Sequence, residues 1–272
     1  MTDQVPGVRV DVVDRSGGCI ARVLIDNERK LNTLNSRLME RLAAELDALA
    51  SMEGLRAVVL ASTGPRAFIG GADIAEMSSL DPATARAFIT RIHRCCDALR
   101  RLPVPVIARI QGYTFGAGLE IAAACDLRVA ADTAVFGMPE VKLGIPSVVE
   151  AALLPMLVGW GRARQILLLG ETFTAAEAER WGLVERVVPA GDLDAAVETW
   201  LVALMEAGPH AVRLQKGLIR AWEDLPLRAA VQAGIDAFAE AWLTDEPREA
   251  MRAFLDAQAT RKRGNDAAGE EV

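Results

Sequence analysis

The sequence predicts an α/β fold in its first two thirds, followed by a helical segment. Short apolar runs typical of strands alternate with amphipathic helical patterns as far as residue 130. Beyond Gly159 the strand patterns nearly vanish, apart from residues 183–188, and helical patterns continue to about residue 263. The composition, with 51% hydrophobic and 25% charged residues, is that of a globular chain. We therefore expect an α/β core at residues 1–198, a helical segment at 199–263 and a disordered tail at 264–272.

Each expected element of the core has a local reason. Residues 8–13 and 20–25 are strand-like runs on either side of a Ser-Gly-Gly turn, which predicts a strand pair. Leucines repeat at helical spacing behind Ser36, so a helix is expected at 36–50 with Ser36 as its N-cap. The remaining core elements are a buried strand at 57–61, a helix at 82–99, a strand at 106–110, a helix starting near Gly118 and a strand at 127–130.

The second part of the sequence contains several helix start signals. Thr174, followed three positions later by Glu177, has the pattern of a capping box, and prolines stand where several first turns are expected. The expected helices begin at Arg162, Thr174, Asp192, Pro209, Pro226 and Pro247. Their apolar residues lie on more than one face, which indicates a second packing partner.

Composition and charge argue against several classes of protein. The formal net charge of −7 argues against a nucleic-acid binder, because neutralising phosphates requires a basic surface. The four cysteines lack metal-site spacing, so we expect reduced thiols packed in the core. His93 and His210 are expected to be ordinary helix-surface residues, and no metal is predicted. The first residues lack the pattern of a secretory signal and no apolar run is long enough for a membrane span, so a cytoplasmic location is expected.

Two glycine-rich turns are candidates for an anion site made of backbone N–H groups. Residues 112–118 lie between a buried strand and a helix, so their N–H groups can converge beside a positive helix terminus. Residues 67–73 follow the strand at 57–61 and offer another free N–H at Ala72. Two converging donors form an oxyanion hole, which stabilises a developing negative oxygen by roughly 2.7–4 kcal/mol per donor.

Two glutamates stand out, the first after the glycine-rich turn at 112–118 and the second directly after a proline. Glu120 closes the segment 116–120, and Glu140 closes the segment 136–140 twenty positions later. Paired carboxylates beside a desolvated pocket can hold different protonation states, so one can act as an acid and the other as a base. The sequence therefore predicts an acid/base pair next to a backbone anion site.

The order and spacing of these segments resemble the crotonase (enoyl-CoA hydratase/isomerase) superfamily, from about Val8 to Pro189 and more loosely beyond. The segments that carry the resemblance are FIGGADI at 68–74, PVIA at 105–108, residues 112–120, ACDL at 124–127 and FGMPE at 136–140. The resemblance implies a spiral core of (ββα) repeats and an acyl-CoA substrate. It also implies no cofactor besides the coenzyme A of the substrate, and homotrimers or hexamers assembled through the C-terminal helices.

The resemblance also implies roles for the predicted site residues. The backbone N–H groups of Ala72 and Ala117 would hold the thioester oxygen, while Glu120 and Glu140 would hold one water between them. Isomerases of the superfamily commonly keep only the glutamate that matches Glu140, so the pair favours an enoyl-CoA hydratase, a lyase of fatty acid metabolism. We expect Glu140 to protonate C2 of the substrate and Glu120 to activate the water that attacks C3.

Further substrate contacts are implied along the same segments. Arg29 and Lys30 match a loop beside the pantetheine and phosphates of CoA, and the basic residues 261–263 are candidates for contact with its nucleotide end. The expected substrate and CoA contacts are Arg29, Lys30, Leu31, Ala67, Ile69, Gly70, Asp73, Ile74, Gly116, Pro139 and Gly144.

The chain departs from the hydratase pattern after Gly144. Residues 145–154 read IPSVVEAALL, where a typical hydratase has a glycine-rich loop that borders the acyl pocket. Val148 and Val149 would narrow this pocket, and Glu150 is a candidate third carboxylate. Glu150 therefore keeps open another acyl-CoA reaction on the same scaffold, either double-bond isomerisation or thioester hydrolysis. A non-catalytic binding protein, including one that binds RNA, is the third alternative.

Overall fold

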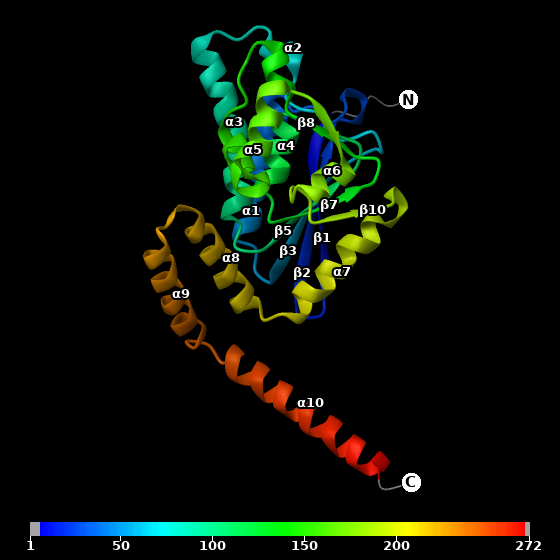
Figure 1. The fold of residues 1–272 in the computed structure, drawn as a ribbon, viewed down its shortest axis with the longest axis vertical. Coiled ribbons are helices and arrows are strands. Elements are labelled where there is room, and N and C mark those ends of the chain that lie inside the picture. Colours follow the sequence, from blue (N-terminus) through cyan, green and yellow to red (C-terminus); the bar gives the residue numbers. More distant parts are fainter. Residues whose placement is uncertain (1–5, 270–272) are drawn as a thin grey trace. The chain divides into compact units, whose positions relative to one another are not determined.

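A computed structural model of the chain describes residues 6–269, with side chains described up to residue 260 (Figure 1). The chain divides into two compact units, Met1–Leu204 and Met205–Val272. The boundary expected after residue 198 falls inside helix α7 (Leu193–Glu206). Strands β1–β10 belong to the first unit and helices α8–α10 to the second, so the predicted order of an α/β part followed by helices is confirmed.

Six strands form the large sheet of the first unit, in the order β1-β2-β3-β5-β7-β10. β1 (Gly7–Arg15) and β2 (Gly18–Asp26) form the predicted antiparallel pair, and Gly17 between them has a φ of +84°. The other neighbouring strands are parallel. β3 (Leu55–Ser62) is buried along its whole length, as expected for a parallel strand covered on both faces. The remaining strands are β5 (Val106–Ile110), β7 (Leu127–Ala131) and β10 (Arg186–Val188).

Four short strands form a second, small sheet whose strands could not be located from sequence patterns. Its order is β4-β6-β8-β9, with β4, β6 and β8 parallel to one another and β9 antiparallel to β8. Three residues are too few for an alternating hydrophobic pattern to differ from that of a turn. The strands are β4 (Ala67–Ile69), β6 (Tyr113–Phe115), β8 (Val135–Gly137) and β9 (Thr172–Thr174).

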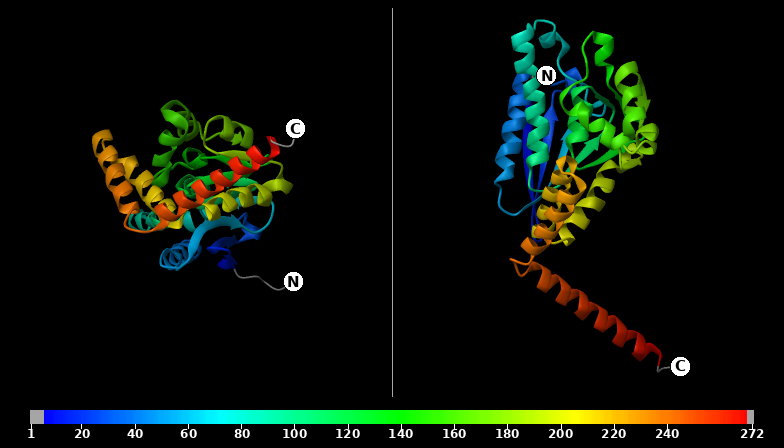
Figure 2. Two further views of the ribbon diagram at one scale, coloured as in Figure 1. Left: turned by 90° about the horizontal axis from the view of Figure 1, so that it is seen from below. Right: turned by 60° about the vertical axis from the view of Figure 1, so that its left-hand side comes forward.

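Helices α1 (Ser36–Ala50) and α3 (Pro82–Arg101) lie side by side (Figure 2). The prediction of Ser36 as the N-cap of α1 was wrong. The cap is Asn35, whose extended backbone lets its side chain accept a hydrogen bond from the Leu38 N–H at 2.9 Å. Ser36 occupies the first turn instead, where its N–H and hydroxyl donate to the carboxylate of Glu76.

Helix α5 (Leu154–Leu169) begins before the start predicted at Arg162. Gly159 has a φ of +74° and interrupts the helix, so the pattern detected in the sequence belongs to its second piece. The next prediction is confirmed, since α6 (Ala175–Arg180) begins with both reciprocal hydrogen bonds of a capping box between Thr174 and Glu177.

The second unit contains α8 (Pro209–Asp224), α9 (Leu227–Ala241) and α10 (Glu246–Gly269). Each begins at or beside a proline predicted to mark a first turn. The backbone of 264–269 belongs to α10, where a disordered tail was expected. Residues 270–272 lie outside the described range. Within that range no helix combines the length and apolarity that crossing a bilayer requires.

Candidate active site

The predicted site residues follow the carboxyl ends of three parallel strands of the small sheet. Residues 70–73 follow β4, residues 116–120 follow β6 and residues 138–140 follow β8. Because these strands are parallel neighbours, the three segments leave the sheet at the same end. The carboxyl ends of parallel strands are where α/β proteins bind their ligands. The small sheet, which could not be located from sequence patterns, therefore brings the predicted residues together.

Glycines mark the places where these segments touch. A Cβ atom added to Gly118 would lie 2.2 Å from the carbonyl oxygen of Ile69, and one added to Gly71 would lie 3.3 Å from that of Phe115. Gly118 therefore lets the first turn of α4 (Ala117–Ala124) pack directly against β4. This packing brings the turn that contains Ala72 beside the turn that contains Ala117.

Ala72 and Ala117 each direct a backbone donor away from the chain's own acceptors. Around Ala72, the Leu34 N–H donates to the Gly71 carbonyl at 2.9 Å, and the Asp73 N–H donates to the Leu34 carbonyl at 2.8 Å. Since alternate groups of an extended segment point to opposite sides, the Ala72 N–H faces away from Leu34. Ala117 is the first residue of α4, where an N–H has no acceptor within the helix.

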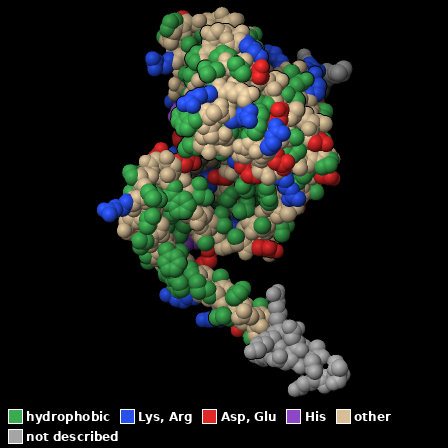
Figure 3. Space-filling view, in the orientation of Figure 1, with side chains coloured by type: hydrophobic (Ala, Val, Ile, Leu, Met, Phe, Trp, Pro, Cys, Tyr) green, Lys and Arg blue, Asp and Glu red, His purple; other side chains and the backbone are tan. Residues whose placement is uncertain are grey.

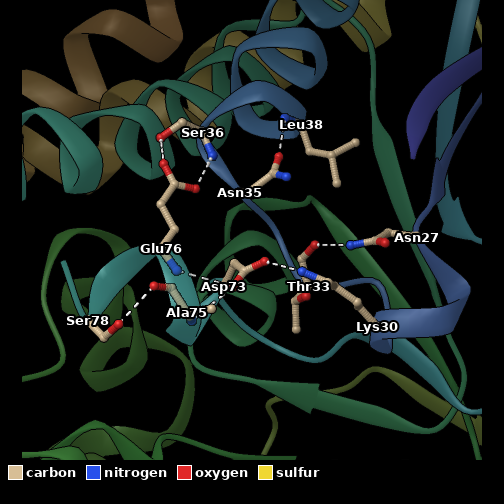
Figure 4. A network of polar contacts seen from close by, with 10 residues as sticks. All are labelled: Asn27, Lys30, Thr33, Asn35, Ser36, Leu38, Asp73, Ala75, Glu76 and Ser78. Carbon is tan, nitrogen blue, oxygen red and sulfur yellow. Dashed lines mark hydrogen bonds and ion pairs between the residues drawn. The ribbon is translucent and has the colours of Figure 1, made fainter. Parts of the chain in front are cut away.

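Polar contacts fix the turn after β4 (Figure 4). Asp73 caps the short helix α2 (Ile74–Met77) by accepting a hydrogen bond from the Ala75 N–H at 3.0 Å. Its other carboxylate oxygen pairs with Lys30 Nζ, also at 3.0 Å. Burial raises the pKa of Asp73, but the Lys30 hydrogen bond and the backbone donors outweigh it, so the pKa is lowered overall. Lys30 and Asp73, both predicted substrate contacts, thus also stabilise this turn.

Glu120 lies on α4 with only 4% of its surface exposed. Burial is the main cause that raises its pKa to about 8, and the charges of Glu140 and Glu150 raise it further. Hydrogen bonds from the backbone N–H groups of Ala151 and Val148 oppose this rise. At neutral pH the Glu120 carboxyl is therefore mostly protonated.

Glu140 lies in the 3₁₀ helix η2 (Pro139–Leu143), against the turn that opens α4. A Cβ added to Gly116 would lie 2.2 Å from its Oε1 atom, and Ser147 donates a hydroxyl hydrogen bond to its Oε2 at 2.8 Å. Burial raises the pKa of Glu140, while local hydrogen bonds, including that from Ser147, lower it. Because Glu120 is the more deeply buried of the two, a single proton shared by the pair favours Glu120. The sequence-based prediction instead made Glu140 the residue that donates a proton.

Gly116→Ala is expected to disturb Glu140 more than it disturbs the fold. Gly116 has a φ of +51°, and its new Cβ would clash with the Glu140 carboxylate. We expect the turnover predicted for the Glu120/Glu140 acid/base pair to slow by roughly 10²-fold, since moving an acid or base by about 1 Å has effects of this size. Gly159→Ala is the matched control, because Gly159 also has a positive φ but has open space for a Cβ. Similar losses of kcat in both variants would contradict the expectation.

The raised pKa of Glu120 predicts a pH-dependent stability. Between the ordinary glutamate pKa of 4.5 and the raised pKa of about 8, the folded protein keeps the proton that the unfolded chain releases, so stability falls as the pH rises through this window. Glu120→Gln cannot ionise, and we expect it to be more stable than the parent at about pH 8, by on the order of a few kcal/mol. The difference should shrink toward about pH 5. Urea unfolding at both pH values measures it, and a difference independent of pH would contradict this account.

The other predicted contacts differ in how they can reach a ligand. Ala67 and Ile69 are buried strand residues, so only their main-chain atoms are candidates for contact. Ile74 is 60% exposed, and the Gly70 N–H donates to the Leu31 carbonyl at 2.9 Å. The side chains of residues 261–263 lie outside the described range. Of the remaining predicted contacts, Arg29 is exposed in η1 (Glu28–Lys30), while Pro139 begins η2 and Gly144 follows its end.

Sequence reasoning missed two residues beside the predicted glutamates. Ser147 was noted only as part of a divergent loop, yet it contacts Glu140. His93 was expected to be an ordinary surface histidine, but its Nδ1 lies 2.8 Å from Oε1 of Glu150. No local pattern connects positions 93 and 150, because only the packing of α3 against the 3₁₀ helix η3 (Val149–Leu153) brings them together.

Comparisons with known proteins agree with the geometry. Residues 15–262 match the family model described as Enoyl-CoA hydratase/isomerase. The Short-chain-enoyl-CoA hydratase of Clostridium acetobutylicum is 33% identical over 247 residues, covering 90% of this chain and 95% of that protein. The Crotonyl-CoA hydratase of Syntrophomonas wolfei is 33% identical over 238 residues, covering 87% and 92%. A crystal structure of an enoyl-CoA hydratase from Bacillus anthracis superimposes with a TM-score of 0.87 at 31% identity, covering 92% of this chain and 96% of that one.

Proposed function

The chain belongs to the enoyl-CoA hydratase/isomerase family, and on this premise we propose that it adds water across the 2,3 double bond of 2-enoyl-CoA thioesters. One observation carries the proposal. The Glu140 carboxylate lies against Gly116, the residue before Ala117, and Glu120 follows Ala117 by one turn on helix α4. This supports two carboxyl groups and a backbone anion site at the carboxyl ends of the same three strands.

The proposed chemistry uses each of these groups. The N–H groups of Ala72 and Ala117 donate hydrogen bonds to the thioester oxygen and stabilise the negative charge that develops on it. Water adds its oxygen to C3 while one ionised carboxylate takes a proton from that water. Electrons shift toward the thioester oxygen, and C2 receives a proton from the other, protonated carboxyl group. The pair begins and ends with one proton, so the reaction needs only substrate and water.

The division of labour between the glutamates is part of the proposal. Sequence reasoning made Glu140 the donor to C2 and Glu120 the base toward water. The deeper burial of Glu120 instead supports Glu120 as the carrier of the proton in the unliganded protein. We therefore propose the singly protonated pair as the active form, because its two carboxyl groups titrate together around one water.

We also propose a homotrimer, or a hexamer of two trimers, for the assembled protein. Helix α9 exposes a stripe of apolar side chains at helical spacing, and Figure 3 shows hydrophobic side chains gathered over the C-terminal helices. The stripe is formed by Leu227, Val231, Ile235 and Phe238, each at least 57% exposed. Such a face is typical of a helix that packs on another subunit. Light scattering measures the mass, and a monomer would contradict this proposal without affecting the proposed reaction.

A turnover screen in ¹⁸O-labelled water tests the proposed function. Saturated, 2-enoyl, 3-enoyl and aromatic acyl-CoA thioesters are incubated with the protein and analysed by mass spectrometry. Hydration adds one labelled water to the 2-enoyl thioester, isomerisation leaves its mass unchanged, and hydrolysis releases free CoA. We expect the first result. Isomerised thioester or free CoA as the main product would replace hydration with another acyl-CoA reaction.

A further inference from the structure

A third carboxylate, Glu150, lies beside the glutamate pair. It belongs to the 3₁₀ helix η3 (Val149–Leu153) and is only 8% exposed. Its Oε1 atom is 2.8 Å from Nδ1 of His93, whose side chain on α3 is 53% exposed. Its Oε2 atom is buried and has no hydrogen-bond partner among the described residues. An exposed histidine thus lies at hydrogen-bond distance from a carboxylate that is almost completely buried.

The segment around Glu150 also forms hydrogen bonds with the Glu120 side chain. The backbone N–H groups on either side, at Val148 and Ala151, are hydrogen-bonded to the Glu120 carboxylate. Between them Val149 has a φ of +41°, a conformation that is strained for a β-branched residue by on the order of 1–3 kcal/mol. Packing therefore maintains an unfavourable backbone here, and this backbone places Glu150 beside Glu120.

The surroundings of Glu150 indicate an electrostatic role. Because its Oε2 is closed to solvent, a substrate does not touch this atom in the observed conformation. The titratable groups that face Glu150 are His93, Cys95 and Cys96 on α3 and Glu120 on α4. Burial, aided by the charge of Glu150, raises the pKa of Cys95 to about 12, so this thiol stays neutral. Of these groups, His93 is the one whose side chain lies at hydrogen-bond distance from the Glu150 carboxylate.

We propose that Glu150, supported by His93, is a positioning residue whose negative charge sets the pH range in which the Glu120/Glu140 pair holds a single proton. This inference rests on the proposed hydration. A negative charge beside the pair makes each loss of a proton harder, so it moves both ionisations to higher pH. The active, singly protonated form would consequently be present at higher pH than the two glutamates alone would allow.

Glu150→Gln tests this proposal because it removes the charge and keeps the shape. The profile of kcat/KM against pH reports the ionisations of the free enzyme. We expect both limbs to move to lower pH, by about half a unit to one unit. His93→Ala should move them in the same direction, since it removes the hydrogen-bond partner that holds the Glu150 carboxylate in place. His93→Asn, which offers an N–H, should restore the parent limbs, and the double variant H93A/E150Q should shift no further than E150Q.

Asp97→Asn is the matched control, because Asp97 is a carboxylate on the same helix that pairs with Arg101 rather than facing Glu150. Its limbs should stay at the parent pH values. A merely structural role for Glu150 would lower kcat/KM at every pH without moving the limbs, and that result would overturn the inference. The two proposals fail separately. A parent protein without hydratase turnover refutes the proposed function, whereas an active parent with unmoved limbs in E150Q and H93A refutes only this inference.

Discussion

Glu120→Gln and Glu140→Gln are each expected to lower kcat for hydration of a 2-enoyl-CoA by roughly 10²–10⁴-fold, the usual contribution of a positioned acid or base. Each glutamine fills the volume of the carboxyl group but can neither accept the proton of water nor supply one to C2. Because the two residues share one proton, the double variant should lose little more than the worse single variant.

Steady-state kinetics and calorimetric titration with a saturated acyl-CoA separate chemistry from binding in these variants. Binding should persist, since the thioester oxygen is held by backbone donors in the proposal. Glu171→Gln offers a matched control at an exposed position. Loss of activity through unfolding is distinguishable for Glu120→Gln, because this variant is expected to gain stability at high pH. Normal turnover by either single variant would refute the acid/base pair.

Ala117→Pro is expected to remove one oxyanion donor while leaving α4 in place. Proline lacks the backbone N–H but is well tolerated at the first position of a helix, where Ala117 lies. The preceding residue is a glycine with φ 51° and ψ −119°, which is outside the α region that proline disfavours. Loss of one such donor lowers kcat by roughly 10²–10³-fold.

Ala117→Gly is the control for this substitution, because it keeps the N–H and removes only a methyl group. Circular dichroism checks that the proline variant is folded, and discontinuous assays with a 2-enoyl-CoA give kcat for both variants. We expect the glycine variant to stay within a few-fold of the parent and the proline variant to lose activity. A folded proline variant with the parent kcat would show that the Ala117 N–H plays no part in the reaction.

The parts of this fold that could be predicted from sequence are those specified by neighbouring residues. The capping box at Thr174 and the buried run of β3 each consist of a few consecutive positions, so their patterns were readable. The cap of α1 was misplaced by one residue, because Asn35 and Ser36 are both good capping residues and only the contact of Ser36 with Glu76 separates them. The break in α5 depended on the backbone angle of Gly159, which a helical pattern does not reveal.

The candidate site was predictable to a similar extent. Glu120, Glu140 and the glycine turns could be placed because each sits in a short, specific motif. The small sheet that brings them together could not be found, since β4, β6 and β8 have three residues each and pair over long sequence separations. The contact between His93 and Glu150 spans 57 positions and leaves no periodic signal. Long-range packing, which a local pattern cannot encode, decided these features.

The loop at 147–151 has a consequence for when, during synthesis, the protein acquires its chemistry. A nascent chain that has emerged only as far as Gly144 already contains both glutamates. It still lacks Ser147, which binds Glu140, and the two backbone donors at Val148 and Ala151 that hold Glu120. Parallel pairings between distant strands also form slowly. On the proposed mechanism, the arrangement that the reaction needs therefore forms late in folding, and a chain that ends before Ser147 contains both glutamates without it.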